Sequence, residues 1–346
     1  MDKVAILWQA LGDGLVHCFL CAQECRIRPG RTGVCGVREN RDGTLYTLVY
    51  GEAVAANVDP IEKKPLFHFL PGTQAFSIAT VGCNLRCKFC QNADISQATK
   101  RETIHGQPLS PEQVVRMARD YRCASIAYTY TEPTIFMEYA LDTARLAVGA
   151  GLANVFVTNG FMTPQSRAAI LPYLHAANVD LKSFNDRYYR QICGARLEPV
   201  LDTIRELHAA GVETEVTTLV VPGGNDSPEE LQAVAGFLVS VSPDIPWHIS
   251  RFFPSYEMVD RPPTPLETLR RAVEIGHQAG LRYIYVGNAP EEGAEDTLCP
   301  ECGYAVIRRT MYRTSVEESA VRCPACGVAV PVVTEVRPRA VPAALQ

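Results

Sequence analysis

Short apolar segments rich in β-branched residues alternate with amphipathic segments from about residue 75 to residue 288. The strand-like segments are 75–83, 124–130, 153–160, 178–183, 213–221, 246–252 and 282–288. The helix-like segments are 110–121, 133–151, 163–174, 197–211, 227–241 and 265–280. This alternation predicts a parallel sheet with right-handed crossovers. Six or seven strand–helix units are too few for a full barrel, so we predict an α/β fold with a partial (β/α)6 TIM-like barrel. A doubly wound open sheet would give the same alternation.

Polar residues gather where the predicted strands end. In both architectures, functional side chains lie at the carboxyl ends of the parallel strands. The residues at or just past these ends include Cys83, Glu132, Thr158, Asn159, Asp180, Lys182 and Arg251. The sequence therefore predicts a functional site at this edge of the sheet.

The chain has thirteen cysteines in 346 residues, and eleven of them fall into three tight groups. The groups are Cys18, Cys21, Cys25 and Cys35; Cys83, Cys87 and Cys90; and Cys299, Cys302, Cys323 and Cys326. The first residues lack the basic segment and cleavage site of a signal peptide. Such close cysteine pairs in so large a chain favour metal binding in the reducing cytoplasm over disulfides.

Net charge and hydropathy limit the classes of partner that the sequence predicts. The net charge of −5 gives no reason to expect nucleic acid. No apolar run approaches 18 residues, so no membrane-spanning helix is expected.

The stretch "VGCNLRCKFCQN" (81–92) places three cysteines in a C-x-x-x-C-x-x-C pattern after the first predicted barrel strand. A structural metal site normally closes with four ligands, whereas three leave one position open for chemistry. Cysteine thiolates hold 4Fe-4S clusters, in which one iron would then stay open. The alternative is a zinc site completed by His68 or Cys123.

This pattern resembles the signature of the radical S-adenosylmethionine (radical SAM) superfamily. Phe89 matches the aromatic position beside the adenine in that family. The resemblance implies that the amino and carboxylate groups of SAM bind the open iron. It also implies a low-potential electron donor, whose electron cleaves SAM and yields a 5′-deoxyadenosyl radical.

Three further segments extend the resemblance. "YTYTEPT" (128–134) is similar to the superfamily's glycine-glycine-glutamate-proline motif, with threonines and Tyr130 at the glycine positions and Glu132 retained for the SAM ammonium. "VTNGF" (157–161) and "DLKSFNDRYY" (180–189) resemble glycyl-radical activating enzymes such as the pyruvate formate-lyase activase. Thr158, Asp180 and Lys182 carry over as cofactor-binding residues, with Asn159 beside them, while Val157 replaces an aspartate. The alternative is a simple turn at Asn159 and a solvated Asp180–Lys182 pair.

"PWHISRFFPSY" (246–256), with "LCAQECRIRPGRTGVCGVR" near the start, resembles the AmmeMemoRadiSam system radical SAM enzyme. That resemblance implies Memo-like and AMMECR-like proteins as partners. His248 and Arg251 are candidates for lining the SAM or substrate pocket. Because alternate strand positions face opposite sides, the alternative is that one of them packs in the barrel wall.

The other cysteine groups predict further metal sites. The C-x2-C-x20-C-x2-C spacing of Cys299 to Cys326 is typical of a zinc ribbon, with a rubredoxin-like iron site as the alternative. Cys18, Cys21, Cys25 and Cys35 fit zinc or a second iron-sulfur cluster, and the spacing decides neither. Cys123 is predicted to be a buried small hydrophobe. Cys193 is predicted to lie near the active face, where an inert buried thiol is favoured over a radical role.

We therefore expect an N-terminal cysteine segment (1–70), a radical SAM barrel (71–290), a zinc-ribbon-like module (295–335) and a tail (336–346). The favoured function is a radical SAM oxidoreductase that abstracts hydrogen from a protein or peptide substrate. A radical SAM enzyme acting on a small molecule with the Memo-like and AMMECR-like partners is the second hypothesis. The third is a zinc-bound interaction protein with an inactive SAM site.

Overall fold

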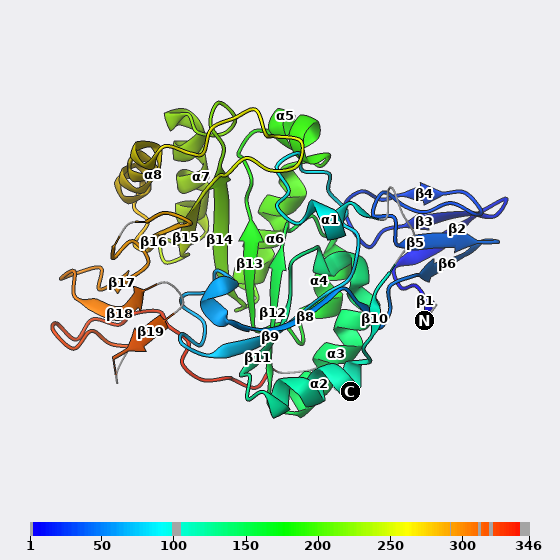
Figure 1. The fold of residues 1–346 in the computed structure, drawn as a ribbon, viewed down its shortest axis with the longest axis horizontal. Coiled ribbons are helices and arrows are strands. Elements are labelled where there is room, and N and C mark those ends of the chain that lie inside the picture. Colours follow the sequence, from blue (N-terminus) through cyan, green and yellow to red (C-terminus); the bar gives the residue numbers. More distant parts are fainter. Residues whose placement is uncertain (1–2, 99–104, 291, 311–312, 318–320, 340–346) are drawn as a thin grey trace.

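A computed structural model describes residues 3–98, 105–290, 292–310, 313–317 and 321–339. Its centre is an eight-stranded sheet in the order β16-β15-β14-β13-β12-β11-β9-β8 (Figure 1). The strands are β8 (Ala55–Pro60), β9 (Gln74–Ala79), β11 (Ser125–Tyr128), β12 (Ala153–Thr158), β13 (Ala176–Asp180), β14 (Glu213–Val220), β15 (Trp247–Arg251) and β16 (Ile284–Gly287). All neighbours from β9 to β16 are parallel, and β8 is antiparallel to β9.

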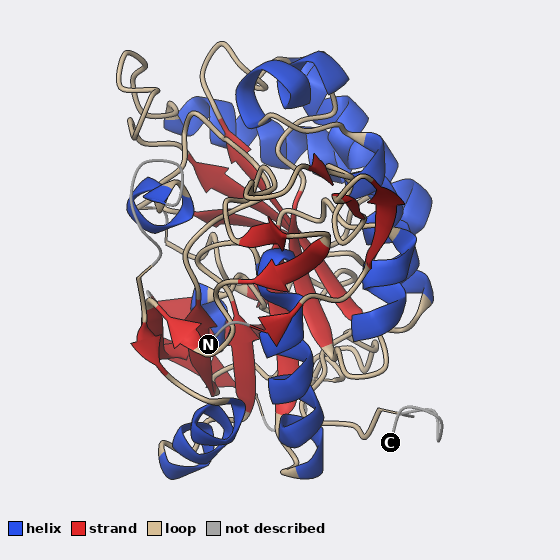
Figure 2. Ribbon diagram, turned by 90° about the vertical axis from the view of Figure 1, so that its right-hand side faces the viewer, coloured by secondary structure: helices blue, strands red, loops and turns tan. Residues whose placement is uncertain are grey.

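The parallel strands follow one another in sequence order across the sheet. A doubly wound sheet would reverse its order at a switch point, so this alternative is wrong. The helices between the strands are α2 (Pro111–Asp120), α3 (Met137–Gly149), α4 (Pro164–Ile170), α6 (Glu198–Ala209), α7 (Pro228–Val241) and α8 (Leu266–Ala279). Figure 2 shows helices gathered along the outer side of the strands. The carboxyl ends of the strands therefore share one edge, as the sequence predicts.

The helices begin where the sequence provides caps. Ser110 accepts a hydrogen bond from the backbone of Gln113, whose side chain accepts one from the Ser110 backbone. The sequence "SPEQ" (110–113) predicts this capping box, with Pro111 at the first helical position, and the box starts α2. Thr163 forms a second capping box, with Ser166, at the start of α4, and the Ser227 side chain accepts a hydrogen bond from the Glu230 backbone at the start of α7. Each of these caps precedes a proline.

The N-terminal segment forms two small antiparallel sheets at one end of the molecule (Figure 1). Their strands are β1 (Lys3–Val4), β2 (Trp8–Gly12), β3 (Leu15–Cys18), β4 (Arg26–Ile27), β5 (Arg38–Arg41) and β6 (Thr44–Thr47). The sequence suggests a hairpin within 43–54, but β6 pairs with β5 instead, through a turn at Asp42 and Gly43 with positive φ angles. β7 (Glu52–Ala53) pairs with β10 (Gln107–Pro108). The central sheet begins at Ala55, earlier than the boundary near residue 70 that the sequence suggests.

The C-terminal module contains β17 (Thr297–Leu298), β18 (Ala305–Thr310) and β19 (Arg313–Val316), beyond the β16 edge of the sheet (Figure 1). Phe67, Tyr285 and Val306 share its buried apolar cluster with Cys299 and Cys323. The Arg309 guanidinium donates to the carbonyl of Phe67 at 2.7 Å and lies 4.3 Å from its ring centroid. The module is therefore packed against the β16 side of the central sheet. Residues 340–346 of the expected tail lie outside the described residues.

No helix among the described residues is long and apolar enough to cross a bilayer.

Candidate active site

A cavity of about 540 Å³ lies at the carboxyl edge of the sheet. Its lining includes nine of the residues predicted from the sequence: Cys83, Cys87, Phe89, Cys90, Glu132, Thr158, Asn159, Asp180 and Lys182. They come from the loops after β9, β11, β12 and β13. The structure therefore brings the three cysteines together with the predicted cofactor-binding residues.

The loop that carries the three cysteines is held by close backbone contacts. Gly82 has a φ of +98°, and an added Cβ there would lie 2.9 Å from the Cys35 carbonyl oxygen, so only glycine fits. The backbone N–H groups of Arg86 and Lys88 donate to the carbonyls of Cys193 and Ile192. Those two acceptors belong to a π-helical turn, Tyr189–Cys193, a form that recurs at functional sites.

Burial raises the pKa of the Cys83 thiol, and the carboxylate of Glu132 raises it further. Burial also raises the pKa of Cys90, although the Ser96 hydroxyl, 3.2 Å from its sulfur, lowers it. The pKa of Cys87 lies well above its ordinary value, first because of its hydrogen bond with Cys193 and then because of burial. A metal ligand must be a thiolate, so a bound metal centre would supply the positive charge that ionises these thiols.

Glu132 ties two strand ends together. Its Oε1 accepts hydrogen bonds from the Thr134 hydroxyl at 2.5 Å, the Thr134 backbone at 3.0 Å and the Thr158 hydroxyl at 2.7 Å. Its Oε2 accepts one from the Asn159 backbone at 2.8 Å. Burial raises the pKa of Glu132, while these hydrogen bonds lower it. With a single donor, Oε2 keeps capacity for a cationic ligand.

Asp180 and Lys182 form an ion pair, with Nζ 2.8 Å from Oδ2. Burial lowers the pKa of Lys182, but Asp180 and Cys87 outweigh it and hold the pKa well above its ordinary value. The Tyr189 hydroxyl accepts a hydrogen bond from the Lys182 backbone at 3.0 Å, which fixes the residue beside the cysteines. The pair lines the cavity and is not merely a solvated surface pair.

Phe89 and Asn159 also take part in the wall of the cavity. The Phe89 ring lies 6.4 Å from that of Tyr188 at 28°, in a stacked arrangement. The Asn159 amide donates to Oδ1 of Asn84 at 2.9 Å and lies 3.7 Å from the Cys83 sulfur. Asn159 is therefore more than a turn residue, because it orients the cysteine loop.

His248 and Arg251 do not line the cavity. Ser250 does, and Arg251, one position later on β15, turns to the other side, where Nε donates to the Thr264 carbonyl. His248 lies deeper in the sheet, where its Nε2 is 2.6 Å from Glu215 and its ring is 4.7 Å from Phe67. The sequence alternative was that one of the two residues is packed away from the pocket. In the structure both side chains are.

Sequence reasoning missed several lining residues. Lys63 and Lys64 lie at the end of a short 3₁₀ helix (Ile61–Lys63) that follows β8, and the sequence did not predict β8 as a strand. Both ammonium groups lie 2.7 Å from the Asp59 carboxylate, to which the Tyr130 hydroxyl also donates. Tyr130 has a φ of +61°, a strained conformation at a position that resembles a glycine in the superfamily motif. The replacement of a motif glycine by Tyr130 was the sequence signal that could have identified this part of the cavity.

The C-terminal cysteines gather around one point. Cys299 and Cys326 have sulfurs 3.4 Å apart, and those of Cys302 and Cys323 are 3.6 Å apart. All four sulfurs lie within 4.8 Å of one another. Tetrahedral thiolates about 2.3 Å from one zinc ion would be about 3.8 Å apart. The four cysteines therefore fit a single metal ion.

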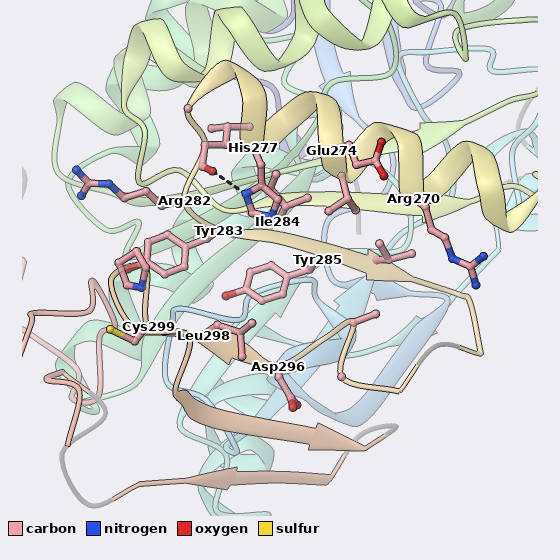
Figure 3. A pocket seen from close by; sticks show the side chains of 18 residues that line it. Arg270, Glu274, His277, Arg282, Tyr283, Ile284, Tyr285, Asp296, Leu298 and Cys299 are labelled. Atoms are coloured by element: carbon pink, nitrogen blue, oxygen red, sulfur yellow. Dashed lines mark hydrogen bonds between the residues drawn. The ribbon is translucent and has the colours of Figure 1, made fainter. Parts of the chain in front are cut away.

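A larger cavity, of about 690 Å³, lies between α8, β16 and the C-terminal module (Figure 3). Arg270, Glu274 and His277 reach it from α8. It contains none of the residues of the three-cysteine loop, and His277 contacts the Leu281 carbonyl at 3.2 Å. This cavity therefore belongs to the packing of the module on the barrel.

The part of the chain that carries the site is similar to known proteins. Residues 77–238, which span the three cysteines and the strand ends above, match the radical SAM superfamily. The chain belongs to the radical SAM superfamily. An uncharacterized protein of Methanocaldococcus jannaschii is 41% identical over 335 residues, covering 96% of this chain and 99% of the relative. The pyruvate formate-lyase-activating enzyme of Clostridium pasteurianum is 22% identical over 161 residues, covering 46% of this chain and 67% of the relative.

A solved structure shares the fold. Streptococcus suis SuiB bound to the precursor peptide SuiA gives a TM-score of 0.50 at 13% identity, covering 66% of this chain and 52% of SuiB. The radical SAM superfamily implies a 4Fe-4S cluster and SAM. Three thiols line one cavity, and its described lining residues include no fourth thiol. A 4Fe-4S cluster with one open iron needs this set of donors.

Proposed function

We propose that this chain binds a 4Fe-4S cluster through Cys83, Cys87 and Cys90 and reductively cleaves SAM, generating a radical for hydrogen abstraction. The observation that supports this proposal is the shared cavity: three thiols, a carboxylate and an ammonium lie together at one edge of a parallel sheet. The parallel strands in sequential order are compatible with the partial barrel predicted from the sequence. When bound, the cluster supplies the electron and SAM supplies the radical.

The residues of the chain have distinct tasks in this proposal. Glu132 receives the SAM ammonium through Oε2, because its other oxygen is already occupied by three donors. The Lys182 ammonium, held by Asp180, interacts with negatively charged groups of the bound ligand beside Cys87. Phe89, buried against Tyr188, offers a ring for the adenine. The enclosing walls limit water near the radical.

The proposed substrate is a protein or peptide. Curated relatives at 22–30% identity include activating enzymes for pyruvate formate-lyase, isethionate sulfite-lyase and benzylsuccinate synthase. The resemblance to the AmmeMemoRadiSam enzymes adds Memo-like and AMMECR-like proteins as partners, with a low-potential protein as the electron donor. One observation favours a small anionic substrate as a second candidate: two lysines, Lys63 and Lys64, share one carboxylate, Asp59, and both line the cavity.

The test is anaerobic. The protein is reconstituted with iron and sulfide, given SAM and dithionite, and assayed for 5′-deoxyadenosine beside the Cys87→Ala variant. Product from the wild type alone supports the proposal. A cluster that binds SAM but cleaves it only after a partner is added identifies a partner-gated enzyme. Failure to assemble a cluster at all contradicts the proposal.

A further inference from the structure

The N-terminal cysteines come together in the fold. Cys18, Cys21, Cys25 and Cys35 line one small cavity of about 10 Å³, together with Arg38 and Ile135. Cys18, Cys21 and Cys35 are buried, and Cys25 is half-buried. None of them forms a disulfide. Cys18 ends β3, and the other three lie in the segments between β3, β4 and β5, so the two small N-terminal sheets and their loops surround this point.

The spacing of these sulfurs differs from that of the C-terminal site. Among the described residues, which include every cysteine, only the group from Cys299 to Cys326 has three or more ligand atoms within 4.8 Å of one another. Neither the N-terminal group nor the three cysteines of the active site is that compact. A single zinc ion needs thiolates about 3.8 Å apart, whereas a cluster spreads its thiolates over separate irons. The N-terminal group therefore shares the wider spacing of the cluster-binding loop.

Arg38 provides a second observation that points to an anionic ligand. The residue is 1% exposed and lines the same cavity. Two of its nitrogens are used, Nη1 by Glu138 at 2.8 Å and Nη2 by the Ile6 carbonyl at 2.5 Å. Its Nε has no hydrogen-bond partner among the described residues. A buried unsatisfied N–H is costly, and a sulfur atom of an anionic cluster would accept it.

We propose that Cys18, Cys21, Cys25 and Cys35 hold a second iron-sulfur cluster, with Arg38 Nε donating to one of its sulfur atoms. Four thiolates close the coordination, so this cluster carries electrons and has no open iron for a substrate. It lies beside the active-site loop: the Gln23 side chain donates to the Asn84 carbonyl at 2.9 Å, and Gly82 packs against Cys35.

The surface near Cys25 suggests where the electron enters. Arg26, Arg28 and Arg31 are exposed on the segment between Cys25 and Cys35, in a chain whose net charge is −5. Local positive charge favours an acidic donor. In this role, which rests on the proposed radical SAM function, the second cluster accepts one electron from a small acidic electron-carrier protein. It passes that electron to the cluster at Cys83, Cys87 and Cys90, and no proton or group moves.

The first test is independent of activity. The Cys83→Ala/Cys87→Ala/Cys90→Ala variant removes the active-site cluster, and a matched variant adds Cys18→Ala and Cys21→Ala. After anaerobic reconstitution, the first should hold about four irons and four acid-labile sulfides, and the second should lose them. Zinc without sulfide in the first variant would overturn the proposal. Retained metal at Cys299 to Cys326 shows that each variant is folded.

The second test addresses the electron route in the otherwise intact enzyme. For wild type and for Arg26→Glu/Arg28→Glu/Arg31→Glu, SAM cleavage driven by reduced flavodoxin is divided by cleavage driven by dithionite. We expect this ratio to fall about 10-fold or more in the variant at low salt. An unchanged ratio would contradict electron entry at these arginines. If neither reductant gives cleavage in wild type, the proposed function fails while the metal analysis still stands.

Discussion

The carboxylate of Glu132 accepts a hydrogen bond from the Asn159 backbone N–H at 2.8 Å. This contact joins the end of β11 to the end of β12 inside the cavity. Asn159 in turn donates to Asn84 in the cysteine loop at 2.9 Å. A single carboxylate therefore connects two strand ends with the loop that carries the three thiols.

Glu132→Gln is expected to weaken SAM binding at least about 10-fold and to lower the free energy of unfolding by about 1.5–3 kcal/mol. The amide places an N–H₂ donor where the carboxylate accepts from the backbone and hydroxyl donors of Thr134, Thr158 and Asn159. Isothermal titration with SAM and urea unfolding measure the two effects. Glu267→Gln, at an exposed position of α8, is the control. Equal SAM affinity in both variants would show that Glu132 does not contact the ligand.

Lys64 is expected to make stability depend on alkaline pH. Burial lowers its pKa from 10.5 to about 8, although Asp59 works against this. Between these values the unfolded chain binds a proton that the folded chain does not, so stability rises with pH through this window. Urea midpoints at about pH 7.5 and 9.5 should show a gain of up to about 2 kcal/mol from this group.

Lys64→Met should abolish that gain, whereas Lys63→Met should keep it. Both lysines bind the same Asp59 carboxylate, but the Lys63 side chain is 44% exposed and that of Lys64 is 1% exposed. If both variants retain the pH dependence, another group is responsible for it.

The buried pair of Arg38 and Glu138 should be sensitive to the loss of one partner. Nη1 and Oε1 lie 2.8 Å apart, with side chains 2% and 1% exposed. Arg38→Met leaves Glu138 as an uncompensated buried charge, which costs about 3–5 kcal/mol of unfolding free energy. Arg38→Met/Glu138→Leu should recover part of that loss. Arg190→Met, from an exposed pair with Asp186, should cost no more than about 1 kcal/mol.

The barrel elements were predictable because hydrophobic periodicity and capping residues are local signals. The Ser110 capping box and the strand ends at Thr158 and Asp180 appear in the structure as the sequence predicts. The cysteine loop and Glu132 were found through motif spacing, which also depends only on neighbouring residues. These features account for most of one side of the cavity.

The remaining wall depends on contacts between distant parts of the chain. Lys64 reaches the cavity because β8 adds antiparallel to β9, a pairing that local periodicity does not specify. Likewise, His248 lies deeper in the sheet than the cavity, and Arg251 points to the opposite side of β15. Only the register of β15 against β14 defines these positions. The hydrogen bond between Cys87 and Cys193 joins residues 106 positions apart, by their numbering.

The C-terminal cysteines are expected to stabilise the packing of their module on the barrel. Cys302→Ala should abolish metal binding at this site and lower the melting temperature, because zinc binding at such sites contributes about 10–16 kcal/mol in small peptides. Metal analysis and calorimetry measure this, with Cys123→Ala, an isolated cysteine, as the control. Iron in place of zinc would favour the rubredoxin-like alternative. Full thermal stability without any metal would contradict a structural role.

Replacement of Cys193 tests whether three or four thiolates of the active site bind the cluster. Its thiol is fully buried and hydrogen-bonded to Cys87, which places it next to the proposed cluster. An open iron for SAM requires that Cys193 stay outside the coordination. Cys193→Ala should therefore keep the iron and sulfide content of the wild type and the shift of the cluster's EPR spectrum on SAM addition. Cys87→Ala should lose the iron and sulfide of the active-site cluster, together with that spectral shift. If Cys193→Ala loses iron as Cys87→Ala does, the centre is closed by four cysteines and SAM has no iron to bind.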